Sequence, residues 1–114
     1  MAKFKDSNIN KFSVEGKVIA IIGATGILGK QYVEYLSKLG ANVIIGDIEY
    51  GRCLDLSESV KALGFNALPL KVDNTSEDSI MEFFSNINKH YKQLDILINN
   101  AQVKPKGFYT SFEN

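Results

Sequence analysis

Apolar residues occur along this chain in short runs separated by segments with helical spacing. Four runs are typical of strands, at residues 18–22, 42–46, 65–72 and 94–98, and the first has no polar break. A continuous branched run of this length indicates a strand buried on both faces, as in a parallel sheet. Between the runs, apolar residues recur every three or four positions and predict helices over about 26–39, 52–63 and 75–91.

The helical segments also predict which side chains are buried. In the first helix we expect one buried stripe of Leu28, Tyr32, Leu36 and Leu39, with Val33 beside it. In the third we expect a buried face of Ile80, Phe83, Phe84, Ile87 and Tyr91. Two residue pairs are candidates to cap that third helix at its start, Thr75 with Asp78 and Asn74 with Glu77.

Three glycines follow the first strand at a spacing of three, at Gly23, Gly26 and Gly29. Strand, glycine turn and helix together form the geometry that binds a dinucleotide pyrophosphate. The first glycine permits a sharp exit from the strand, the second lets a phosphate approach the backbone, and the third allows close packing of the helix. The helix start then offers unpaired N–H groups to the phosphates. The alternative is a tight strand–helix turn that binds no ligand.

The second strand ends in Asp47, about 20 residues past the glycine turn. A dinucleotide-binding fold places there the acid that contacts the adenosine ribose. Such an acid favours NAD, because the 2′-phosphate of NADP would bring like charges together. Lys30 and Arg52 are the counter-argument, since either could contact that phosphate if Asp47 turned away. The alternative is an ordinary loop or capping aspartate.

The alternation of strands and helices predicts an α/β fold, a doubly wound parallel sheet of the Rossmann type with strand order 3-2-1-4. Pro69 agrees with this order, because a proline cannot donate to a sheet ladder and the third strand lies at an edge. We expect residues 1–114 to form a single dinucleotide-binding domain that is truncated after its fourth strand. Residues 1–11 would be a loose lead-in and residues 103–114 a loop tail.

Composition limits the partners, metal sites and cellular compartment that we expect. Thirteen basic residues balance thirteen acidic ones among 114, which does not suggest nucleic acid or a membrane surface as a partner. Cys53 is the single cysteine, so neither an internal disulfide nor a multi-cysteine metal site is expected, and a reducing compartment fits. No apolar run reaches the roughly 20 residues of a membrane span. A soluble, cytoplasmic protein without a metal site is the expectation.

Taken in order, these motifs resemble the short-chain dehydrogenase/reductase family from about residue 12 to residue 101. The stretch before the first strand, residues 12–18, looks like the family's usual opening, and Asn99-Asn100-Ala101 looks like its Asn-Asn-Ala-Gly motif. The resemblance implies that Asp73 receives the adenine amino group and that the Asn-Asn-Ala segment lines the cofactor cleft. The residues expected to contact a dinucleotide are Gly23, Thr25, Gly26, Ile27, Leu28, Gly29, Asp47, Ile48, Asp73, Asn74, Asn100, Ala101 and Gln102.

Two residues and the spacing of the glycines depart from the family pattern. Ile22 stands where the family usually has threonine, and Gln102 replaces the last glycine of its Asn-Asn-Ala-Gly motif. The glycine spacing is that of the branch with many nucleotide-sugar enzymes, which hints at a sugar or nucleotide-sugar substrate. The resemblance implies hydride transfer between a nicotinamide and an alcohol or carbonyl carbon, with a small-molecule substrate in the complete enzyme. We also expect a homo-oligomer or pairing with a missing C-terminal half, because a sheet that ends with the strand at 94–98 leaves an open, apolar edge.

The family's chemistry uses a Tyr-x-x-x-Lys pair, in which the lysine lowers the pKa of a proton-transferring tyrosine. The five tyrosines of this chain are followed four positions later by Leu36, Leu39, Leu54, Asp95 and Glu113. No catalytic residue is therefore assigned. Two other readings remain, a dinucleotide-binding module without catalysis and a methyltransferase of similar topology, although the Asn-Asn-Ala segment and glycine spacing argue against the latter.

We expect the isolated 114-residue chain to show no dehydrogenase activity, because no tyrosine is paired with a lysine at the required spacing. The measurement is cofactor oxidation at 340 nm with a panel of carbonyl substrates. Turnover of any of them by the pure chain would contradict the prediction.

Overall fold

The computed structural model describes residues 13–101 as strands and helices in strict alternation. In chain order these are β1 (Val18–Ile22), α2 (Ile27–Lys38), β2 (Asn42–Asp47), α3 (Tyr50–Ala62), β3 (Ala67–Lys71), α4 (Glu77–Tyr91) and β4 (Ile96–Asn99). All seven predicted elements are present, and no end is shifted by more than two residues. The predicted lead-in at residues 1–11 and loop tail at 103–114 lie outside the described residues.

The four strands form one parallel sheet in the order β3-β2-β1-β4, as the sequence predicted. β1 lies in the interior, where Ile21 pairs with Ile45 of β2 on one side and Ile98 of β4 on the other. Pro69 lies on β3 at the sheet edge, where its missing N–H leaves no gap in a second ladder. The order therefore places the carboxyl end of β1 between those of β2 and β4.

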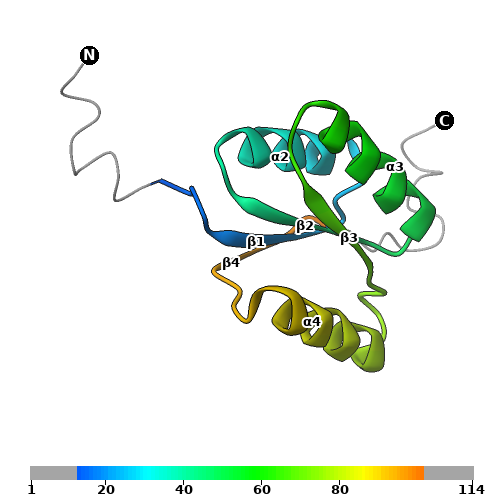
Figure 1. The fold of residues 1–114 in the computed structure, drawn as a ribbon. Coiled ribbons are helices and arrows are strands. Elements are labelled where there is room, and N and C mark those ends of the chain that lie inside the picture. The colour runs from blue at the N-terminus through cyan, green and yellow to red at the C-terminus, as the bar shows by residue number, and fades with distance from the viewer. Residues whose placement is uncertain (1–12, 102–114) are drawn as a thin grey trace, which may run out of the picture.

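Helices cover both faces of the sheet, α2 and α3 on one and α4 on the other (Figure 1). Side chains alternate along a strand, so each face of β1 contributes to a separate buried cluster. The cluster beneath α2 and α3 contains Ile19, Ile21, Val33, Val43, Ile45, Cys53, Leu56 and Val60. The cluster above α4 contains Val18, Ala20, Ile22, Ile44, Phe83 and Ile87, with Ile80, Phe84 and Tyr91 partly buried against it. The predicted buried face of the third helix is thus confirmed.

The ends of the helices agree with the signals in the sequence, except at the start of α4. Gly40 and Gly64 come just after α2 and α3 with φ of 91° and 95°, a conformation that glycine adopts without strain. The predicted caps of α4 are wrong, because Ser76 is its N-cap and accepts a hydrogen bond from Ser79 N at 3.2 Å. Thr75 lies one residue before this N-cap, and its hydroxyl donates to Asp73.

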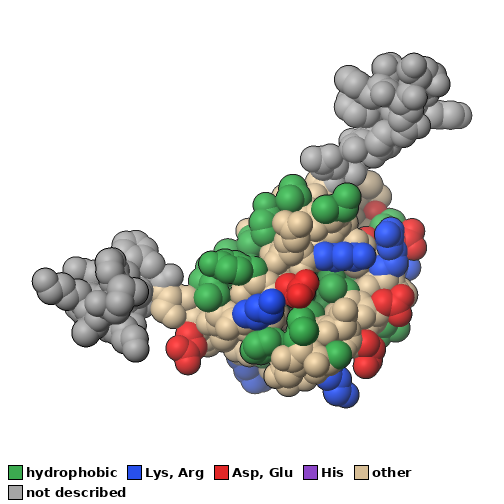
Figure 2. Space-filling view, turned by 90° about the horizontal axis from the view of Figure 1, so that it is seen from above, with side chains coloured by type: hydrophobic (Ala, Val, Ile, Leu, Met, Phe, Trp, Pro, Cys, Tyr) green, Lys and Arg blue, Asp and Glu red, His purple; other side chains and the backbone are tan. Residues whose placement is uncertain are grey.

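The predicted buried stripe of α2 is wrong in part. Val33 is buried and Leu36 is partly buried against the core, whereas Leu28, Tyr32 and Leu39 keep 53%, 38% and 45% of their surface exposed. The buried residues are instead Gly29, Val33 and Ser37, spaced by four, and at Gly29 the helix approaches the glycine turn too closely for a larger side chain. The displaced apolar residues lie on the outer side, and Figure 2 shows hydrophobic side chains gathered on the part of this face where α2 lies.

Within residues 13–101, β4 is an edge strand with apolar side chains open on both faces. Ile96 and Leu97, which point to opposite faces, are 38% and 45% exposed. An open, apolar strand edge is a site for pairing with another chain.

None of the helices between residues 13 and 101 has the length and apolar character needed to cross a bilayer.

We expect Leu97→Lys to reduce self-association of the chain, because a charge on an edge strand opposes pairing. Met81→Lys on α4 is the matched control, since Met81 is also an exposed apolar residue, at 70%, but lies on a helix. Light scattering at increasing concentration measures the effect. Equal behaviour of the two variants, or a wild-type chain that stays monomeric, would contradict the prediction.

Candidate functional site

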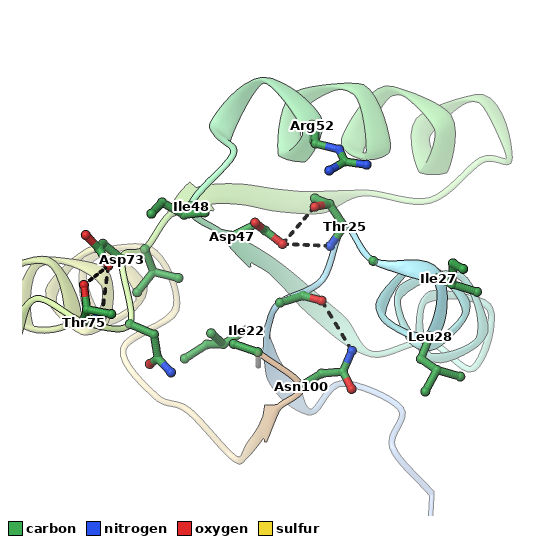
Figure 3. A pocket seen from close by; sticks show the side chains of 15 residues that line it. Ile22, Thr25, Ile27, Leu28, Asp47, Ile48, Arg52, Asp73, Thr75 and Asn100 are labelled. Atoms are coloured by element: carbon green, nitrogen blue, oxygen red, sulfur yellow. Dashed lines mark hydrogen bonds between the residues drawn. The ribbon is translucent and has the colours of Figure 1, made fainter. Parts of the chain in front are cut away.

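A cleft of about 860 Å³ opens at the carboxyl ends of β1, β2 and β4 and extends to the segment after β3 (Figure 3). In an open parallel sheet, ligands bind at this end, where the strand order reverses direction along the chain. The reversal here is between β1 and β4, beside the glycine turn. The cleft is lined by Ile22, Gly23, Thr25, Gly26, Ile27, Leu28, Asp47, Ile48, Arg52, Val72, Asp73, Asn74, Thr75, Asn100 and Ala101.

Two of the three glycines are required by close backbone packing. Gly23 has a φ of 79°, and a Cβ on it would lie 2.6 Å from Ala101 N. A Cβ on Gly29 would lie 2.5 Å from Gly23 O. The positive φ of Gly23 and the close packing at Gly29 are of the kind that the sequence predicted. Gly29, however, packs α2 on the glycine turn itself and does not line the cleft.

Gly26 differs from the other two because nothing crowds it. A Cβ there would meet only Gly23 O, at 3.9 Å, so packing does not explain this glycine. It is the N-cap of α2, where no side chain caps the helix and no acidic residue lies in the first turn. A helix start in this state presents N–H groups and a partial positive charge to the cleft. The geometry therefore suits a phosphate group.

Asp47, at the end of β2, is held by the glycine turn. Its Oδ2 accepts hydrogen bonds from Thr25 N at 3.1 Å and Thr25 Oγ1 at 2.8 Å, and its Oδ1 accepts one from Glu49 N at 3.2 Å (Figure 3). The sequence predicted an acid at this place but not these bonds. Asp47 thus ties the end of β2 to the turn after β1.

Asp73, just after β3, forms a similar pair with Thr75. Its Oδ1 accepts from Thr75 Oγ1 at 2.6 Å and from Thr75 N at 2.9 Å. The hydroxyl bond first, and then the backbone bond, hold the pKa of the Asp73 carboxyl below its usual value. Asp73 N donates to Ser79 Oγ at 2.8 Å, so α4 fixes the segment from below. The pair presents a charged carboxylate to the cleft.

The segment after β4 closes the cleft on the remaining side. Asn100 N donates to Ile22 O at 2.8 Å, and Asn100 Nδ2 donates to Gly23 O at 3.5 Å. Ala101 N donates to Asn99 Oδ1 at 3.2 Å. These bonds fix the end of β4 against the glycine turn.

Most of the residues predicted to contact a dinucleotide line this cleft. Gly29 is buried behind the turn and Gln102 lies outside the described residues. The prediction missed Ile22, Arg52, Val72 and Thr75. Thr75 follows Asp73 by two residues, the spacing at which an Asp side chain accepts from the backbone N–H in a turn, so the sequence could have indicated this contact. Arg52 lies in the first turn of α3, and Figure 3 shows its side chain extending from that helix near Thr25.

The other reactive groups of the described chain are poor candidates for chemistry. Burial, with a smaller contribution from the Asp47 charge, raises the pKa of the Cys53 thiol to about 12, so it stays protonated and unreactive near neutral pH. Residues 13–101 contain no cluster of three histidine, cysteine or acidic side chains that could hold a metal ion.

Comparison with known families agrees with this geometry. The family model for short chain dehydrogenases matches residues 17–114. This chain belongs to the short-chain dehydrogenase family. The curated relatives include a short chain dehydrogenase/reductase of Gibberella zeae, 36% identical over 91 residues, which cover 80% of this chain and 33% of that protein. They also include the 2-dehydro-3-deoxy-D-gluconate 5-dehydrogenase of Pseudoalteromonas atlantica, 32% identical over 82% of this chain and 37% of the relative.

Solved structures of the family share the fold. A metagenomic short-chain oxidoreductase in complex with NADP superposes with a TM-score of 0.76 at 26% identity, over 81% of this chain and 42% of the other. A short chain dehydrogenase/reductase from Burkholderia phymatum in complex with NAD gives 0.71 at 20% identity, over 75% and 31%. Neighbours thus bind either cofactor. This short-chain dehydrogenase chain spans about a third of the length of the curated relatives it matches.

We expect Gly29→Ala to destabilise the chain by about 1–3 kcal/mol, because its Cβ would meet backbone atoms that have no room to move. Gly51→Ala is the matched control in the first turn of α3, where a Cβ meets nothing within 4 Å. Alanine is the better helix former, so the control should be stabilised by about 0.5–1 kcal/mol. Urea unfolding measures both, and equal effects would contradict the packing role of Gly29.

Proposed function

We propose that this chain binds the adenosine and pyrophosphate part of a nicotinamide dinucleotide. The observation that carries the proposal is the uncrowded Gly26 at the uncapped start of α2, inside a cleft formed by the strand ends. Thr25, Gly26, Ile27 and Leu28 would surround the pyrophosphate, and Asp73 with Asn74 would face the adenine. The Asn100–Ala101 backbone would support the side of the cleft nearest the nicotinamide.

In the complete enzyme, the bound cofactor would exchange hydride with the carbon of an alcohol or carbonyl group. The present residues would bind and orient the dinucleotide, and the proton-transferring groups would come from sequence outside this chain. The glycine spacing and the relative that acts on a deoxygluconate support a sugar-like substrate. A dinucleotide-binding module without catalysis is the second candidate, favoured by the absence of a Tyr-x-x-x-Lys pair from the 114 residues.

The preferred cofactor in this proposal is NAD. Asp47 lies at the end of β2 and lines the cleft, where its carboxylate would accept from the adenosine ribose and repel a 2′-phosphate. Arg52, which also lines the cleft, opposes this preference, so we expect moderate discrimination. The lone cysteine supports a cytoplasmic setting, and the open β4 edge supports a partner, either a second copy or the rest of the enzyme.

We expect NAD to bind more tightly than NADP by about 10-fold or more, since placing like charges together costs several kcal/mol where water is excluded. Asp47→Asn should reduce this ratio several-fold while the amide keeps the size of the side chain. Arg52→Gln should increase it, because a cation near the 2′-phosphate is lost. Calorimetric titration of both cofactors measures the ratio. A wild type that prefers NADP, or a ratio unchanged in Asp47→Asn, would overturn the NAD preference.

A further inference from the structure

The hydrogen bonds of Asp47 leave little of its carboxylate free. A carboxylate offers about four lone-pair positions, two on each oxygen. Thr25 N and Thr25 Oγ1 occupy both positions of Oδ2, and Glu49 N occupies one of Oδ1. One position therefore remains, on Oδ1. The 2′- and 3′-hydroxyls of an adenosine ribose would need two.

The Thr25 hydroxyl cannot easily give up its place. Only 3% of the Thr25 surface is exposed, so its hydroxyl has little access to water. A buried hydroxyl that loses its acceptor carries the full cost of desolvation. At 2.8 Å to a charged oxygen, the bond is also of the stronger, charge-assisted kind. An incoming ribose hydroxyl would have to replace this bond with one of no greater strength.

We propose that Thr25 is a specificity-determining residue, whose hydroxyl occupies Asp47 Oδ2 and limits the adenosine ribose to a single hydrogen bond, at Oδ1. This inference rests on the proposed function, because it assumes that a dinucleotide enters this cleft. Of the 2′- and 3′-hydroxyls, one therefore carries the recognition by Asp47 and the other does not. Thr25 also orients the carboxylate before the cofactor arrives, since both of its donors come from the rigid turn between β1 and α2 (Figure 3).

The first experiment needs no variant. The full chain is titrated in a calorimeter with NAD, with NAD that contains 2′-deoxyadenosine and with NAD that contains 3′-deoxyadenosine. One of the deoxy analogues should bind about 10- to 150-fold more weakly than NAD, the loss of a hydrogen bond to a charged group. The other should bind within about twofold of NAD. Equal penalties for the two analogues would overturn the inference.

The second experiment removes the hydroxyl. In Thr25→Ala, which removes both the hydroxyl and the space that it fills, the freed position on Oδ2 lets the ribose form a second bond, so both deoxy analogues should be penalised. Thr25→Ser keeps the hydroxyl and should retain the wild-type pattern of one penalised analogue. Ser57→Ala is the control outside the cleft, because it removes a partly buried hydroxyl that donates to Ala67 O at 3.2 Å. Its pattern should remain that of the wild type.

The outcomes separate the two proposals. A wild-type chain that binds none of the three probes overturns the proposed function and this inference with it. Binding of NAD with both analogues penalised in the wild type overturns the inference alone. A Thr25→Ala variant that folds but still penalises one analogue shows that the hydroxyl does not limit the contact, which also overturns it. If Thr25→Ala does not fold, the wild-type titrations decide.

Discussion

Backbone-to-backbone packing around the glycine turn is the constraint on which this site depends. Gly23 lies against the backbone of Asn100 and Ala101, and Gly29 lies against Gly23 and Ala24, each too close to admit a Cβ. The first contact fixes the turn against β4, and the second fixes α2 against the turn. Because neither contact involves a side chain that could adjust, the start of α2 is held rigidly at the mouth of the cleft. Gly26 can then remain open to a ligand.

Hydrogen bonds from Thr25 to Asp47 extend this rigid unit to β2. Thr25 is part of the turn, so its two bonds to Oδ2 join the glycine turn and the end of β2 into one unit. Asp73 and Thr75 form a separate piece, anchored to α4 through Ser79. A dinucleotide in this cleft would span both pieces. Preformed contacts of this kind reduce the ordering cost of binding, which is one source of affinity in small-molecule sites.

Features that depend on residues next to one another in the chain could be predicted from the sequence. Features that depend on close contact between segments that are distant in the chain could not. Pro69 and the alternation of strand and helix predicted the sheet order, and Gly40 and Gly64 marked helix ends. The face of α2 was mispredicted because hydrophobicity ranks Leu28 above Gly29, whereas the short helix–turn distance favours the smaller residue. The bond from Thr25 to Asp47 joins residues 22 apart, and no local pattern encodes it. Arg52 reaches the cleft only because α3 begins directly beside β2.

The contacts between β1 and the end of β4 also bear on how the chain folds. Val18 N donates to Asp95 Oδ2 and Asn100 Nδ2 donates to Gly23 O, each across 77 positions. Closing a loop of that length costs chain entropy before any contact compensates for it, and such non-local pairing slows folding. The glycine turn acquires its final neighbours only after β4 has docked beside β1. The cleft is thus assembled by the slowest class of contact in the chain, and a ligand bound there would stabilise the whole sheet against unfolding.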